Sequence, residues 1–146
     1  MCLKAHEGKK IAEEDIVVYK IICKNTDVRN GKFMYEPPFE YGHFLYKKGI
    51  NSTATELEGI YQHCDDIDGP YTEVNFGFLH AFTNLDRAIF KMNVHFDNYG
   101  AGNRFYTYHV FKMVIPKGTE YFEGNDSDIC SKELLWKDMT PVISLE

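Results

Sequence analysis

One stretch of the chain, residues 77–119, constrains the fold more than any other. It opens with an apolar segment, after which Thr83 can act as a helix N-cap with Asp86 three residues later. Apolar residues then recur at helical spacing, which predicts an amphipathic helix over about 84–96. A glycine-containing loop leads to residues 105–115, which are apolar on both faces and predict a long buried strand. Strand, helix and strand in this order indicate a helix packed on a sheet.

The rest of the chain favours further strands. Residues 15–23 are apolar on both faces, as in a central strand. Asn30-Gly31 is typical of a hairpin turn. Further strands are expected at 39–47 and 72–82, with edge strands at 121–122 and 133–136 and a strand or tail at the end of the chain. Residues 1–14 are polar and predict a weak helix at best, whereas residues 50–70 fit either a short helix or a lid-like loop.

These elements predict an α+β fold. The expected architecture is a mixed, mostly antiparallel sheet with one clear amphipathic helix and one or two short helices. A length of 146 residues fits a single domain over residues 1–146. Aromatic residues make up 15% of the chain, which favours strands and also supplies rings that can stack on a flat ligand.

Charge and cysteine usage narrow the functional classes. The net charge is -6, and no cluster of basic residues is dense enough to bind along a phosphate backbone. Direct nucleic-acid binding is therefore not expected. No apolar run is long enough to span a bilayer, and the first residues lack the apolar core of a secretory signal. The four cysteines show no paired spacing, which predicts free thiols in a cytoplasmic protein.

The familiar metal and phosphate motifs are incomplete. A calcium loop read from Cys64 has Cys64 and Asn75 where an acid and a glutamate are required. Asn125 stands where a phosphate-binding loop requires lysine. The glycines before Arg104 precede a strand, so they do not form a dinucleotide fingerprint, although glycines beside an arginine can form an anion nest. We therefore expect neither a metal nor a cofactor.

Five residues are candidates for ligand binding. His80 lies at the end of a predicted strand just before a helix start, where anions are favoured. Tyr19, Tyr46 and His109 lie on predicted strands and can line a cleft, and Arg104 can hold a phosphate. For each of them, ordinary packing in the sheet or loop is the alternative.

Three motifs carry a resemblance to a known group. They are Gly77-Phe78 with His80-Ala81-Phe82, Asn84-Leu85 and Ala88; Ile115-Pro116-Lys117-Gly118-Thr119 with Tyr121 and Gly124; and Asp128-Ile129-Cys130-Ser131. With them the chain resembles a group of small proteins encoded by phages and prophages. The resemblance implies an intracellular setting, in the host-cell cytoplasm, and no particular activity. The turn at residues 115–119 also resembles ADP-ribosyltransferase-like folds.

The main hypothesis is a non-enzymatic phage binding protein that counters host defence. It would sequester a small nucleotide-derived signal, with aromatic rings stacking the base, or it would block a host protein. The alternative implied by the second resemblance is an enzyme acting on NAD, in which Tyr19 and His80 orient the ribose and Glu133 or Glu120 stabilises the reacting centre. The third hypothesis is a pure protein-interaction module. Self-association into a homo-oligomer is compatible with each hypothesis.

Overall fold

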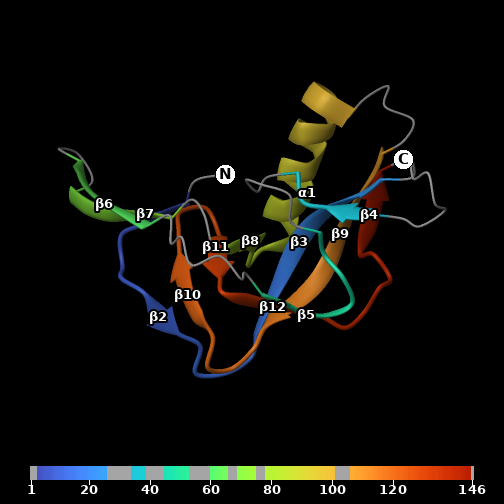
Figure 1. Cartoon of the computed structure of the whole chain (residues 1–146). Coiled ribbons are helices and arrows are strands. Elements are labelled where there is room, and N and C mark those ends of the chain that lie inside the picture. Colours follow the sequence, from blue (N-terminus) through green and yellow to red (C-terminus); the bar gives the residue numbers. More distant parts are fainter. Residues whose placement is uncertain are drawn as a thin grey trace.

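The computed structural model describes residues 3–25, 34–38, 45–52, 60–65, 69–74, 78–100 and 106–145, and they form two sheets and a helix (Figure 1). The strands are β1 (Leu3–Ala5), β2 (Lys10–Ile11), β3 (Ile16–Asn25), β4 (Met34–Glu36), β5 (Gly49–Ser52), β6 (Ile60–Asp65), β7 (Gly69–Val74), β8 (Leu79–Phe82), β9 (Tyr106–Ile115), β10 (Glu120–Glu123), β11 (Asp128–Ser131), β12 (Glu133–Trp136) and β13 (Ile143–Leu145). Helix α1 spans Leu85–His95 and continues as a π-helical turn, Phe96–Gly100.

The larger sheet is built on the long antiparallel pair β3 and β9. These strands pair along their whole length, from Ile16 opposite Ile115 to Asn25 opposite Tyr106. The strand order is β2-β10-β11-β8-β3-β9-β12-β5, with β4 paired to β3 and β13 to β9. The sequence therefore predicted the central strand at residues 15–23 and the long strand at 105–115 correctly, because segments that are apolar on both faces are buried on both faces.

The larger sheet curls back on itself at Lys132. This single residue separates β11 from β12, yet β11 pairs with β8 and β10 whereas β12 pairs with β9 and β5. The bent strand thus joins both halves of the sheet around one apolar interior, which we call the curled core. Its buried members are Ala12, Val18, Ile22, Tyr46, Leu79, Ala81, Phe111, Met113, Ile115, Ile129, Leu134 and Trp136.

Helix α1 covers the opposite face of β3 and β9 (Figure 1). Ala88 and Met92 are fully buried there, against a cluster that includes Ile21 and Val110. The helix predicted over 84–96 is confirmed, because its apolar residues and its cap are both local in the sequence. The cap is nevertheless Asn84, whose side chain accepts a hydrogen bond from the Arg87 N–H at 3.0 Å.

Thr83 was the wrong choice of cap because the helix begins one position later, at Leu85, and the Asn84 side chain supplies the acceptor. The backbone N–H and the hydroxyl of Thr83 both donate to the carbonyl oxygen of Ser127, at 2.9 and 3.4 Å. These contacts join the start of α1 to the turn between β10 and β11. That turn holds Asp126 and Ser127 with positive φ angles of 56° and 68°, an uncommon conformation for residues other than glycine.

Asn84→Ala is expected to lower the free energy of unfolding by about 1 kcal/mol, since one orphan N–H at the helix start loses its acceptor. Chemical denaturation followed by circular dichroism measures the change. Asn93→Ala, on the exposed side of the same helix, is the matched control and is expected to be neutral or slightly stabilising. A larger loss from Thr83→Ala than from Asn84→Ala would contradict this assignment of the cap.

The second sheet is a short three-stranded one with the order β1-β7-β6. Leu3 and Val74 are buried against Phe78 and Phe122. This sheet therefore packs beside β10 and β11 of the larger sheet. Gly124 is needed at this junction, because a Cβ there would lie 2.8 Å from the Leu3 side chain and 3.2 Å from the Lys4 carbonyl oxygen.

Several segment predictions need correction. Residues 3–5 and 10–11 are strands and not helix, because they complete sheet edges beside β7 and β10. Residues 72–82 are not one strand: β7 and β8 belong to different sheets. Both expected edge strands are internal, since β10 lies between β2 and β11 and β12 lies between β9 and β5.

Other predictions fall partly outside the described residues. The Asn30-Gly31 turn lies outside them, although β3 and β4 on either side pair antiparallel. Most of the expected strand at 39–47 also lies outside, and residues 45–48 are not in a strand. In the uncertain stretch 50–70, the described residues belong to β5, β6 and β7 and not to a helix.

Two features of the expected fold class differ in the described part of the chain. Every strand pairing described is antiparallel, so the mixed character is not seen there. Beyond α1 and its π-helical turn, the described residues contain no further helix. The fold is mainly β, and no described helix has the length and apolar character needed to cross a membrane. The strand expected at the end of the chain is confirmed as β13.

Candidate ligand-binding site

A row of three side chains across neighbouring strands forms the floor of a small cleft. Cys23 on β3 lies opposite Glu36 on β4 and opposite Tyr108 on β9. Residues that pair in this way in an antiparallel sheet point to the same face, here the face covered by α1. Cys23 and Tyr108 are each only 4% exposed, so this row is fixed by packing as well as by strand register.

The last turn of α1 and the π-helical turn that follows form a wall of the cleft above this floor. The His95 Nδ1 atom lies 2.9 Å from the Tyr108 hydroxyl oxygen, and the Tyr99 ring centroid lies 4.9 Å from that of His95. Phe96 meets Tyr108 edge to face with 5.5 Å between ring centroids. A π-helical turn is rare and is often found at functional sites. Here it carries Tyr99, which is 75% exposed, to the mouth of the cleft.

We call this site the aromatic cleft. It has a volume of about 170 Å³, and Pro37 and Pro38 complete its lining with Cys23, Glu36, His95, Tyr99 and Tyr108. Sites for drug-sized ligands usually measure about 300–1,000 Å³. The aromatic cleft is therefore large enough for one ring or head group, and the remainder of a larger ligand has to lie outside it.

Burial sets the protonation states of Cys23 and His95 in the cleft. It raises the pKa of the Cys23 thiol to about 12; contact with Tyr108 lowers the value by less, and the charge of Glu36 raises it slightly. Cys23 is consequently a neutral thiol at physiological pH. Burial also lowers the pKa of His95, which keeps its imidazole neutral. Glu36, whose Oε1 accepts a hydrogen bond from the Asn25 side-chain amide at 3.3 Å, is then the formal charge among the described lining residues.

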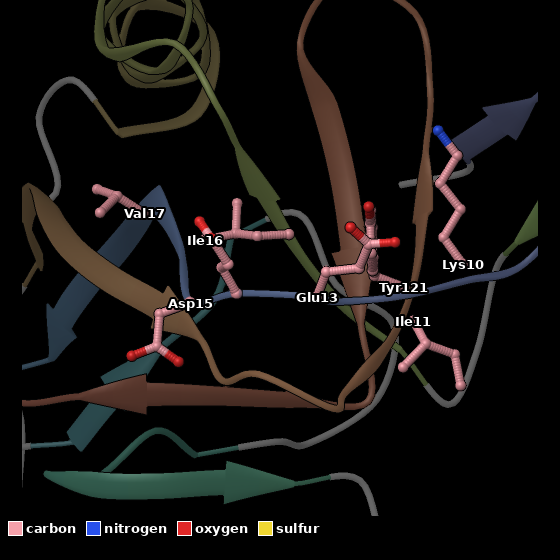
Figure 2. Close-up of a pocket in the computed structure, with 8 residues that line it drawn as sticks. Lys10, Ile11, Glu13, Asp15, Ile16, Val17 and Tyr121 are labelled. Carbon is pink, nitrogen blue, oxygen red and sulfur yellow. The ribbon is translucent and has the colours of Figure 1, made fainter.

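A larger depression lies between β2 and β3 but brings no functional set together. It measures about 780 Å³ and is lined by Lys10, Ile11, Glu13, Glu14, Asp15, Ile16, Val17 and Tyr121. Figure 2 shows the lining side chains of residues 10–17 spread along one extended segment and Tyr121 on a different strand, with Asp15 and Lys10 pointing in different directions. Lys10 pairs with Glu7 and Glu123, and the Asp15 carboxylate accepts the Lys117 N–H at 2.9 Å. Lys10 and Asp15 are therefore engaged in contacts of the local fold.

A third cavity, of about 330 Å³, gathers both glutamates that the ADP-ribosyltransferase resemblance implied. Glu120 and Glu133 line it together with Lys117, Gly118, Thr119 and Lys132. Lys9 pairs with Glu120 at 3.3 Å. Tyr19 and His80, the other two residues of that hypothesis, do not line this cavity.

The four predicted ligand-binding residues that the structure describes are distributed over both faces of the larger sheet. Tyr19 packs on the α1 side, and His80 lies on the same side because its neighbours Leu79 and Ala81 face the curled core. Tyr46 belongs to the curled core.

His109 lies near that core, and its ring nitrogens contact the hydroxyls of Thr107 and Ser144 at 2.7 and 2.6 Å. His80 is 2% exposed, opposite Cys130 in the strand register. Arg104 lies outside the described residues. The four described candidates, Tyr19, Tyr46, His80 and His109, are not among the residues that line the aromatic cleft.

Sequence reasoning missed every residue of the aromatic cleft. Cys23 was considered only as a free thiol, and His95 and Tyr108 were treated as parts of a helix and a strand. Pro37-Pro38 and the histidine four residues before Tyr99 were the available signals, but they become meaningful only once β4, β3 and β9 are placed side by side.

A buried lysine was also missed. Lys20 is 3% exposed, its Nζ donates to the carbonyl oxygen of His80, and it lies 4.9 Å from the Tyr46 ring centroid. At this place β3 and β8 share a single described pairing, Tyr19 with Phe82. The Lys20 Nζ thus adds a side-chain hydrogen bond between β3 and β8.

The described cysteines Cys23, Cys64 and Cys130 form no disulfide, and the described residues hold no group of three or more side chains suited to a metal ion. Comparisons with protein-family models, curated proteins and solved structures found no match. The function of the chain is therefore inferred from the chemistry of the site itself.

Proposed function

We propose that the chain is a non-enzymatic binding protein that holds the ring of a small ligand in the aromatic cleft. The observation that carries the proposal is the convergence of the His95, Tyr99 and Tyr108 rings on one cavity of about 170 Å³. Tyrosines offer large, rigid contact area at low entropic cost, and stacking on a planar ring adds to the area they bury. The exposed Tyr99 at the mouth provides the surface on which a ring can enter and stack.

Protonation of the cleft supports binding over catalysis. A thiolate is the reactive form of cysteine, but the raised pKa of Cys23, about 12, keeps it as the thiol. The nearby imidazole of His95 contacts the Tyr108 hydroxyl, so its Nδ1 is already engaged. Among the described lining residues, the cleft thus offers no activated nucleophile paired with a base, which covalent chemistry requires.

The resemblance to phage and prophage proteins suggests the biological setting. In that setting the ligand is a small nucleotide-derived signal of host defence, and the protein sequesters it in the host-cell cytoplasm. Its base would occupy the aromatic cleft, while its sugar and phosphates would remain outside because the cavity admits a single ring. The net charge of -6 disfavours long nucleic acids as ligands and leaves small molecules as the better fit.

A thermal-shift screen of the purified protein against nucleosides, nucleotides and cyclic dinucleotides tests the proposal. A ligand at 100 times its Kd adds about 2.7 kcal/mol to the free energy of unfolding, which raises the Tm by several degrees. Tyr99→Ala is expected to weaken binding about 5- to 150-fold, the usual range for loss of one stacked ring.

The matched control is Phe90→Ala, an exposed aromatic on α1 that does not line the cleft. It is expected to bind as the unmodified protein does. Equal losses from both variants, or a shift that survives Tyr99→Ala together with Tyr108→Phe, would place the ligand elsewhere. If no compound shifts the Tm, the cleft proposal loses its support and capture of a host protein becomes the next experiment.

The cavity that Glu120 and Glu133 share favours a second candidate, an ADP-ribosyltransferase-like enzyme acting on NAD. Paired carboxylates can stabilise the positive charge that develops when a glycosidic bond breaks. Turnover of NAD that is lost in Glu120→Gln or Glu133→Gln, with the fold intact, would support this enzyme. Absence of turnover in the unmodified protein, or activity retained in both variants, would exclude it.

A further inference from the structure

We propose that the group held in the aromatic cleft is an organic cation, such as a quaternary ammonium or a ring with a fixed positive charge. This inference rests on the proposed function, in which the cleft is the ligand site, and it names the charge of the group that enters. It follows from the combination, among the described lining residues, of one carboxylate, several aromatic rings and two prolines.

The described lining residues of the cleft carry a net negative charge. Glu36 contributes a carboxylate, and its described partner is the neutral amide of Asn25 rather than a lysine or arginine. An ionised carboxylate only accepts hydrogen bonds, so it attracts a cation or an N–H group. Burial lowers the pKa of His95, so the imidazole is uncharged at neutral pH and does not repel a cation in the cleft.

The aromatic rings are placed to act with that carboxylate. Tyr108 forms the floor next to Cys23, and Tyr99 stands on the opposite wall beside His95. The negative faces of tyrosine rings attract cations, and quaternary ammonium groups are commonly bound in cages of such rings. Glu36 faces Tyr108 across Cys23 in one row of three strands, so a head group in the cleft meets ring and carboxylate together.

The remaining lining selects an organic cation over a metal ion. Proline has no N–H, and the Cys23 thiol is neutral, so Pro37, Pro38 and Cys23 present mainly apolar atoms. A metal ion requires several oxygen, nitrogen or thiolate ligands, and the described residues provide no group of three for it. A cation whose surface consists of methyl groups is only weakly hydrated in water. It therefore loses little hydration free energy when it enters an apolar lining. The volume of about 170 Å³ suits a head group of that size.

A pair of probes with the same shape and different charge tests the inference. Choline and its neutral isostere 3,3-dimethylbutan-1-ol are titrated into the full chain, with binding followed by NMR shifts and by the Tm. We expect choline to bind about tenfold more tightly than the neutral alcohol. Glu36→Gln keeps the shape of the side chain and is expected to lower choline affinity about tenfold without changing that of the alcohol. Glu133→Gln, which removes a carboxylate from the other cavity, is the control and should leave both affinities unchanged.

The outcomes separate this inference from the proposed function. Equal binding of both probes, abolished by Tyr99→Ala, would overturn the cation and keep the cleft as a ring site. No binding of choline up to the highest soluble concentration would also overturn the inference, and the nucleotide screen would still decide the proposed function. Choline binding that survives both Glu36→Gln and Tyr99→Ala would show that the cation lies elsewhere, which contradicts the inference as well.

Discussion

Trp136→Ala is expected to lower the free energy of unfolding by about 3–5 kcal/mol, the usual cost of removing a fully buried tryptophan. Trp136 has no exposed surface and lies in the curled core between Phe111 and Tyr35, with ring centroids 4.6 and 5.1 Å away. Its Nε1–H donates to the Asp138 carbonyl oxygen at 3.0 Å. Alanine would therefore leave a large cavity and an unpaired carbonyl at the end of β12, on the bent strand that joins both halves of the sheet.

Such a loss is a large part of the 5–15 kcal/mol that holds a typical domain folded. Urea denaturation has to be followed by circular dichroism, because Trp136 is the only tryptophan and the variant loses its fluorescence signal. Phe90→Ala, which removes an exposed ring, is the matched control and should change stability by less than about 0.5 kcal/mol. A loss near 1 kcal/mol for Trp136→Ala would mean that the curled core is not packed as described.

The unmodified protein is expected to lose stability steeply as the pH rises above 9, because of Cys23. Its pKa is about 9 in an unfolded chain and about 12 in the folded protein, since burial penalises the thiolate. Between these values the unfolded state releases a proton that the folded state keeps. The free energy of unfolding therefore falls as the pH rises, by up to about 1.4 kcal/mol per pH unit.

Cys23→Ala removes this contribution and is expected to flatten the decline between pH 9 and 11, although its stability at pH 7 should be lower than that of the unmodified protein because a buried side chain is shortened. Denaturant midpoints measured at pH 7, 9, 10 and 11 provide the comparison. Cys64→Ala is the control, since Cys64 is exposed and its removal should leave the alkaline decline in place. Equal declines for the unmodified protein and Cys23→Ala would show that Cys23 is not the group responsible.

Local patterns in the sequence predicted the elements that depend on local causes. The helix over 84–96 follows from apolar spacing and a capping residue within one turn, so its error is one position at the cap, Asn84 instead of Thr83. The long strands β3 and β9 follow from continuous apolar runs. Short strands such as β11 carry too few residues for a pattern, and only their partners β8 and β10 make them strands.

The position of a strand within the sheet was decided by tertiary structure. Residues 133–136 have the length and composition expected of an edge strand. They lie inside the sheet because the chain bends at Lys132 and places β12 between β9 and β5. The two faces of the sheet likewise separate Tyr19 and His80 from Tyr46 and His109, which the sequence could only treat as one set of candidates.

By itself, the sequence determined a mainly antiparallel sheet with one amphipathic helix, because periodicity and capping act over a few neighbouring residues. The aromatic cleft was decided by tertiary structure alone. Its floor depends on a register that sets Cys23 opposite both Glu36 and Tyr108, and a shift of one residue would turn these side chains to the other face. Its wall depends on where the last turn of α1 comes to lie over that row. Contacts between residues so far apart in the chain leave no pattern in one sequence, because each residue type there is also an ordinary choice for a strand or a helix.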